Sequence, residues 1–215
     1  MTKTKQDARP SLTRHALLLA AVLGALSSTA CAPLIVGGAM VGGAMVATDR
    51  RTSGTQVEDE GIELKAAGNV RNQLGDKVHV NINSYNRVVL ITGEANSEAS
   101  REALERIVGA TENVQKVLNE TAVMGASSLT SRSNDVLLAG KVKAGLLDAR
   151  DLMSNAFYVV VERGTVYLMG RVTEREANRA AEIARSVSGV SKVVRAFEII
   201  SEEELARIIP AKPKQ

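Results

Sequence analysis

The 215-residue sequence predicts an α+β fold made of two tandem α-β-β-α-β modules, each a three-stranded mixed sheet packed on two helices. Two observations carry this prediction. A hairpin pattern occurs twice, in residues 79–95 and 157–173, and each copy is followed by a charged, alanine-rich stretch. Each copy also has a helical pattern before it and an apolar strand pattern after it. The chain therefore contains one internal repeat, and each repeat unit can bury one apolar layer between its sheet and its helices.

The two hairpins show the alternation that is typical of β-strands. In residues 78–83 apolar side chains alternate with polar ones, which gives each strand one apolar and one polar face. Turns are expected at Tyr85-Asn86 in the first copy and at Arg163-Gly164 in the second.

Helices are expected on both sides of each hairpin, followed by a last strand. Before the hairpins, apolar residues recur at helical spacing, at positions 62, 66, 70 and 74 in the first copy and at 138, 142 and 146 in the second. The expected later elements are helices at 97–110 and 174–187 and strands at 113–123 and 189–199.

The chain is expected to divide into five segments. They are a signal peptide (1–30), an apolar Gly-rich tether that begins at an acylated cysteine (31–56), the first module (57–126), the second module (130–200) and a polar tail (201–215). The boundary between the modules is expected in 125–135, which is rich in Gly, Ser and Asn. The sequence of the tail is compatible with a short helix before Pro210.

The first thirty residues have the layout of a secretory signal. Residues 1–14 are basic and polar, an apolar run follows, and small residues precede Cys31, the only cysteine. Cys31 stands where a bacterial lipoprotein carries its lipid anchor, with Ser28 where such signals usually have Leu. The alternatives are an ordinary signal cut near Ala30 and an uncleaved membrane hairpin over 16–47. Ala32 follows the cysteine, where an Asp would indicate retention in the inner membrane. Its presence therefore favours a location at the periplasmic face of the outer membrane.

The composition excludes several classes of function. A single cysteine and two histidines leave no zinc site, and no phosphate-binding loop or catalytic constellation is present, so we expect no enzyme, cofactor or metal. Without the leader the chain has 23 basic and 23 acidic residues, and aromatic residues make up only 2% of the full sequence. We therefore expect no nucleic-acid binding, which uses cationic surfaces and stacking aromatic side chains.

These repeats resemble a known family. The motif consists of a hairpin strand that contains a glycine near its end and a last strand with two valines three residues apart. In the first copy these are Val89 to Gly93 with Val114 and Val117. In the second copy they are Val166 to Gly170 with Val190 and Val193. It resembles the BON domain, and two copies after a lipoprotein signal and the stretch Thr48–Glu60 are similar to dual-BON outer-membrane lipoproteins. The resemblance implies a non-catalytic periplasmic protein that contacts phospholipid and supports envelope integrity. It places the lipid contact on the first helix of the second copy.

The charges of the two modules agree with this implication. Residues 57–129 hold seven basic and eleven acidic residues, a net −4, whereas residues 130–200 hold eleven basic and eight acidic residues, a net +3. Only the second module should be attracted to anionic headgroups. Its first helix is expected at 134–153, with an N-cap at Asn134 or Asp135.

The expected phospholipid-binding residues on that helix are Leu137, Lys141, Val142, Lys143 and Leu147. Exposed leucines beside lysines are typical of an interfacial helix. The alternative interpretation is an amphipathic core helix with a solvated rim. A different class of function also stays open, a protein–protein adaptor that docks on an envelope assembly complex through the acidic first module or a sheet edge.

Overall fold

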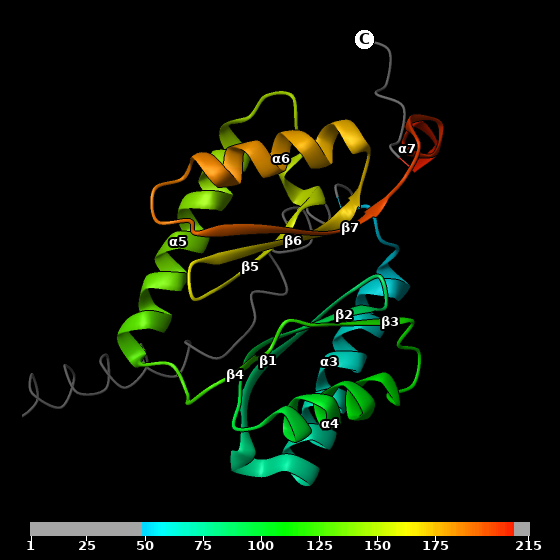
Figure 1. Ribbon diagram of the computed structural model, residues 1–215. Helices are drawn as coiled ribbons and strands as arrows, with labels where there is room; N and C mark the ends of the chain where they lie inside the picture. The colour runs from blue at the N-terminus through cyan, green and yellow to red at the C-terminus, as the bar shows by residue number, and fades with distance from the viewer. Residues whose placement is uncertain (1–48, 209–215) are drawn as a thin grey trace, which may run out of the picture. The chain divides into compact units, whose positions relative to one another are not determined.

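The computed structural model describes residues 49–208, which lie in one compact unit, Met45–Gln215 (Figure 1). The predicted signal peptide, Cys31 and the tether up to residue 48 lie outside the described residues. Within residues 49–208, no helix is both long and apolar enough to cross a membrane.

The first module contains two helices on one face of a mixed sheet (Figure 1). Strand β2 pairs antiparallel with β1 and parallel with both β3 and β4. The elements are α3 (Ser53–Leu74), a 3-10 turn (Gly75–Lys77), β1 (Val78–Tyr85), β2 (Val88–Ala95), α4 (Glu98–Gly109), β3 (Lys116–Asn119) and β4 (Ala122–Val123). The predicted third strand is thus interrupted at Glu120 and Thr121. There the Glu120 N–H still donates to the Ile91 carbonyl oxygen of β2 at 2.9 Å, whereas the Thr121 N–H donates to the Asn119 side-chain oxygen at 3.2 Å.

The second module repeats this order with one continuous third strand. Its sheet has the order β5-β6-β7, antiparallel and then parallel. The elements are α5 (Leu129–Asp148), a 3-10 turn (Ser154–Ala156), β5 (Tyr158–Glu162), β6 (Thr165–Val172), α6 (Glu174–Ser186), β7 (Lys192–Ile199) and α7 (Glu202–Ile208). The predicted α+β class, with a mixed sheet packed on helices in each module, is confirmed.

Hydroxyl side chains determine where four of the helices begin. Thr52, Ser97, Ser128 and Thr173 each accept a hydrogen bond from a backbone N–H in the first turn of the following helix. For α5 this cap corrects the prediction: the helix begins at Leu129 rather than at 134, and it ends at Asp148 rather than at 153. The predicted boundary segment 125–135 is therefore partly helical.

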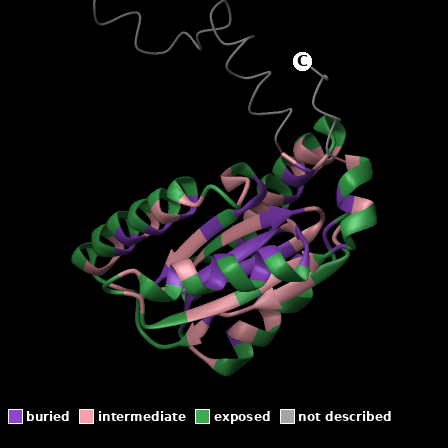
Figure 2. Ribbon diagram, turned by 90° about the horizontal axis from the view of Figure 1, so that it is seen from above, coloured by how far each residue is buried: buried purple, intermediate pink, exposed green. Residues whose placement is uncertain are grey.

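Each module has its own apolar core between sheet and helices (Figure 2). In the first module Ile62, Ala66 and Val70 from α3 pack on β2 and α4. In the second, Val142 and Leu146 from α5 pack on β6 and on the alanines of α6. The helical spacing in the sequence therefore predicted the core-facing side of both first helices.

One buried aspartate in each module fixes the hairpin turn. Asp59 accepts hydrogen bonds from the backbone N–H groups of Asn86 and Arg87, both at 2.8 Å, and Asp135 does the same for Arg163 and Gly164 at 2.8 and 2.9 Å. All four turn residues have positive φ between 49° and 71°. A carboxylate that accepts two amide hydrogen bonds stabilises this uncommon backbone.

The first turn lies one residue later than predicted, at Asn86-Arg87. Tyr85 belongs to β1 and is 4% exposed. It lies in a third apolar cluster, whose buried members are Tyr85, Leu90, Tyr167 and Met169. This cluster takes residues from both sheets, so the sheet faces opposite the helices also bury apolar surface within the compact unit. The sequence predicted only one buried layer for each module.

Polar side chains from both sheets lie beside this cluster. Arg163 Nη1 lies 3.2 Å from a carboxylate oxygen of Glu94, which is 2% exposed, and Asn81 Nδ2 lies 3.3 Å from Glu162 Oε2. Burial and the neighbouring Glu94 carboxylate raise the pKa of Glu162. The folded state therefore favours the protonated form of Glu162, and its contribution to stability is lost as the pH rises through the raised pKa.

We expect Glu162→Gln to raise the urea midpoint of unfolding at pH 7, because the amide removes the buried charge. As the pH falls to 4 and the carboxyl is protonated, the difference between the variant and the unchanged protein should shrink. Urea titrations at both pH values check this, with Glu105→Gln as the control because Glu105 is exposed on α4. A gain at pH 4 as large as that at pH 7 would contradict the assignment.

Candidate lipid-binding face of the second module

One side of helix α5 packs against the core, and a large apolar side is exposed to solvent. Leu138, Val142 and Leu146 are buried. At 100° per residue, Leu129, Val136 and Leu147 fall within about 20° of one another on the opposite side. They are 78%, 72% and 71% exposed, and Leu137 on the adjoining flank is 66% exposed. A single helix thus carries four exposed large apolar side chains.

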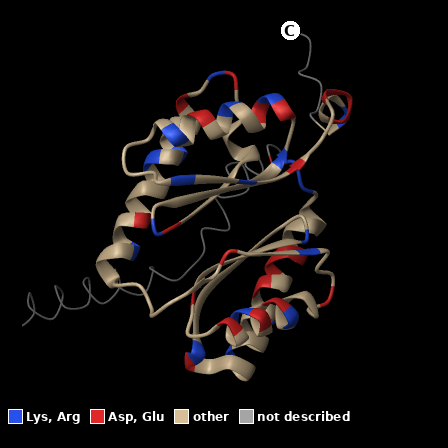
Figure 3. Ribbon diagram, in the orientation of Figure 1, with Lys and Arg blue, Asp and Glu red and all other residues tan. Residues whose placement is uncertain are grey.

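Two lysines lie within this apolar surface. Lys141 and Lys143 are exposed, and neither forms an ion pair with any residue of the described range 49–208. By contrast, Lys65, on the first helix of the first module, binds Glu112 with an N–O distance of 2.7 Å. Acidic residues are frequent on α3 and α4, whereas α5 shows few (Figure 3). The charge difference between the modules is therefore also a difference between their first helices.

The structure groups the predicted residues on two flanks of α5. Lys143 and Leu147 line a groove of about 390 Å³ with Phe157 and Val159 at the β5 edge. Leu137 and Lys141 line another groove of about 420 Å³, beside the 163–164 turn. Each flank thus combines one lysine with one exposed leucine next to a depression in the surface.

Val142 does not belong to this surface, which corrects one of the five predicted residues. Its side chain is 0% exposed and belongs to the second module's core. Val142 follows Leu138 by four residues, so both lie on the same side of the helix. The four remaining residues, Leu137, Lys141, Lys143 and Leu147, are exposed. Their contact with lipid stays a prediction.

Sequence reasoning missed Leu129 and Val136. Their seven-residue separation matches two helical turns, and Leu147 follows Val136 by eleven residues, or three turns. The sequence predicts a helix that begins at 134, so Leu129 falls outside the predicted helix and the seven-residue spacing to Val136 is not apparent. Ser128, the residue that caps α5, was the available signal.

Within residues 49–208, no cluster of three or more His, Cys, Asp or Glu side chains could hold a metal ion. His79, which was expected to be an exposed strand residue, has a 43% exposed side chain with Nδ1 3.3 Å from a carboxylate oxygen of Glu94. Glu202, Glu203 and Glu204 lie in the first turn of α7. Glu204 binds Arg171 at 2.7 Å, so this acidic run contributes to packing.

Comparison with known proteins agrees with the architecture. The model of the BON domain matches residues 63–125 and 134–201. The outer membrane lipoprotein DolP of Haemophilus influenzae is 35% identical over 185 residues, 85% of this chain and 95% of that protein. A 21 kDa hemolysin of Actinobacillus pleuropneumoniae is 30% identical over 154 residues, 71% of this chain and 79% of that protein.

Among solved structures, the chain resembles CdsD, a structural protein of the type III secretion system of Chlamydia trachomatis. The match covers 74% of this chain and 99% of CdsD, with 13% identity and a TM-score of 0.25, which is too low to inform function. The family match and the DolP similarity together cover both modules. The chain therefore belongs to the BON domain family, as a dual-BON protein of the DolP type.

Proposed function

We propose that this protein is anchored by lipid at Cys31 to the periplasmic face of the outer membrane. There it binds anionic phospholipid through the second BON domain and supports outer-membrane integrity. The observation that carries the proposal is the exposed apolar side of α5 beside two lysines without an ion pair in the described chain. The similarity to a protein named an outer membrane lipoprotein supports the location. The proposed role requires no catalysis.

The chemistry of α5 suits the membrane interface. Leu147 and Leu137 can enter the boundary between headgroups and acyl chains, where burying a side chain of this size contributes about 1.5–3 kcal/mol. Lys141 and Lys143 would stay at headgroup level, each contributing about 1 kcal/mol toward anionic lipid. These terms give modest affinity, and a lipid anchor would add to it by holding the domain near the membrane.

The first test is liposome flotation of residues 45–215, which form a compact unit without the leader and Cys31. Vesicles with and without anionic phospholipid would be compared at low and high salt. We expect binding only to anionic vesicles and loss of binding at high salt, because salt screens exposed charges. The Lys143→Glu, Leu147→Glu double variant should bind at less than about one tenth of the original level.

A matched control is available on the first module. Like the α5 double variant, Lys65→Glu with Val57→Glu replaces one exposed lysine and one exposed apolar side chain by glutamate on the first helix of a module. Val57 is 70% exposed. This control should float with anionic vesicles like the unchanged protein. Equal binding by the α5 double variant would reject the proposed face, and no binding by any form would leave Cys31 as the proposed membrane contact.

A further inference from the structure

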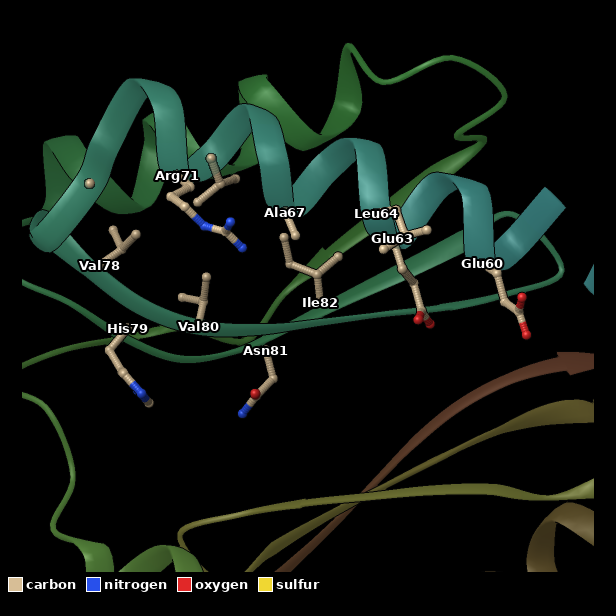
Figure 4. Close-up of a pocket in the computed structure, with 12 residues that line it drawn as sticks. Glu60, Glu63, Leu64, Ala67, Arg71, Val78, His79, Val80, Asn81 and Ile82 are labelled. Atoms are coloured by element: carbon tan, nitrogen blue, oxygen red, sulfur yellow. The ribbon is translucent and has the colours of Figure 1, made fainter. Parts of the chain in front are cut away.

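The first module carries a larger groove, between α3 and the edge strand β1. Its volume is about 610 Å³. Its floor is apolar: Val78, Val80 and Ile82 point from β1 toward the helix, whereas His79 and Asn81 point away (Figure 4). On the helix side, Leu64 is 77% exposed at the rim. The groove therefore combines an apolar floor with an exposed apolar rim.

Among the strands of residues 49–208, β1 lies at the edge of its sheet and pairs only with β2. In an antiparallel pair, every second residue directs its N–H and C=O away from the partner strand. The Lys77 carbonyl accepts from the Asn96 N–H, which places the odd-numbered residues toward β2. The N–H and C=O groups of Val78, Val80 and Ile82 therefore point outward, and they form no hydrogen bond with any residue of the described range.

One end of this edge is acidic. The Ser84 N–H, the next outward group, donates to a carboxylate oxygen of Glu63 at 2.7 Å. Glu60 lies beside it at the groove and is exposed. Burial raises the pKa of Glu63, and the neighbouring Asp59 and Glu60 carboxylates add to this effect. A cationic side chain placed here would gain favourable interactions with Glu60 and Glu63.

The equivalent groove of the second module has a different chemistry. When the turn-binding aspartates Asp59 and Asp135 are aligned, Glu60 corresponds to Val136 and Glu63 to Ala139. Conversely, Ala67 and Arg71 correspond to the proposed lipid contacts Lys143 and Leu147. The positions of Glu60 and Glu63 thus carry no charge in the second module, and the position of Ala67 carries a lysine there.

From the free strand edge, the apolar floor and the acidic end, we propose that the α3–β1 groove binds an extended segment of a partner protein as an added strand on β1. The segment has apolar residues at alternate positions, which enter the groove, and a Lys or Arg beside Glu60 and Glu63. The backbone groups of three outward residues provide six hydrogen-bonding groups for the added strand. This site is independent of the lipid-binding proposal, and it gives the adaptor alternative a defined surface.

The segments of this chain outside the described residues fit the site poorly. Residues 31–47 contain no charged side chain and cannot supply the cation. Residues 209–215 contain lysines, but Pro210 and Pro213 lack the N–H groups that strand pairing requires. The chemistry therefore favours a segment from another protein.

The test uses the full-length chain in detergent and three labelled probe peptides. The first, GKTVTVTVG, has alternating valines and one lysine; the second replaces the lysine by glutamate; the third replaces the valines by proline. We expect fluorescence polarisation to detect binding of the first probe only. Hydrogen exchange followed by NMR should show slower exchange at the amides of residues 78, 80 and 82, which binding through side chains alone would not cause.

Variants with exposed changes make the test specific. Leu64→Glu and Glu60→Lys should each weaken the lysine probe about tenfold, and Glu60→Lys should bind the glutamate probe better than the unchanged protein. Val57→Glu, on the same helix outside the groove, should have no effect. The Lys143→Glu, Leu147→Glu variant should bind the probe normally, and Glu60→Lys should still float with vesicles. No binding of the lysine probe at millimolar concentration, or binding without protection of the three amides, would overturn the proposal.

Discussion

Arg50→Ala is expected to lower the free energy of unfolding by about 3–5 kcal/mol. The Arg50 guanidinium and the Glu176 carboxylate form two parallel hydrogen bonds of 2.8 Å, and their side chains are only 2% and 4% exposed. Arg50 also donates to the Arg171 carbonyl oxygen at 2.8 Å. Removing the guanidinium leaves a buried carboxylate without its counter-ion, which is among the more destabilising single changes.

The effect should depend on pH. Burial alone would raise the pKa of Glu176, but the hydrogen bonds from Arg50 and from the Thr173 N–H outweigh burial and lower it. In the unchanged protein the ionised form of Glu176 therefore stabilises the fold above its unfolded pKa, and this contribution is lost as the pH falls through the lowered pKa. Arg50→Ala removes the hydrogen bonds and the charge of Arg50 that lower this pKa, so we expect the pKa of Glu176 to rise in the variant. The difference between variant and unchanged protein should be largest at neutral pH and smaller at pH 4.

Thermal and urea unfolding would measure this, with an expected decrease in Tm of about 10 °C. Arg179→Ala is the control, because Arg179 pairs with Asp151 and Glu182 through side chains that are all at least 46% exposed, and its loss should amount to about 1 kcal/mol or less. The double variant Arg50→Ala, Glu176→Gln should recover part of the stability. Equal losses of unfolding free energy for Arg50→Ala and Arg179→Ala would show that the buried ion pair stabilises the fold no more than the exposed pairs do.

Gly93→Ala should destabilise the first module by about 3 kcal/mol, because the added methyl group forces steric overlap and backbone strain. Gly93 has φ 113°, a region that residues with a Cβ rarely adopt. A Cβ would collide with the backbone carbonyl oxygen of His79 and lie 2.9 Å from the Val80 Cα. Because these are backbone atoms of the paired strand, the hairpin itself must shift. Gly170 has φ 151° in the corresponding position of the second module.

Gly68→Ala provides the matched control. Gly68 lies within α3, and a Cβ there meets no atom within 4 Å. Alanine favours a helix by about 1 kcal/mol relative to glycine, so this variant should gain stability. Urea titrations would compare the two variants. If Gly93→Ala were as stable as the unchanged protein, the close approach of β1 and β2 at Gly93 would be refuted.

The periodic elements could be predicted from sequence because their signals are local. Ile62, Ala66 and Val70 repeat at helical spacing within one element, and the alternation in β1 spans eight residues. The exposed flank of α5 followed from the same periodicity once Leu138 and Leu146 were placed in the core. The cap of α5 could not be predicted in this way, since several serines near its start could each cap the helix.

The sequence by itself determined the two-module α+β architecture, the core side of each first helix and the opposite charges of the modules. Only the tertiary structure decided that Arg50, in the predicted tether, binds Glu176 at a separation of 126 residues, and that Tyr85 joins Tyr167 in a third buried cluster. It also decided that the β1 edge lies beside an apolar groove with two glutamates at one end. The physical reason is that the repeat of apolar residues is a property of one helix or strand and can be seen in its own sequence. These contacts depend instead on how segments that are distant in the sequence pack together, and no local pattern specifies that packing.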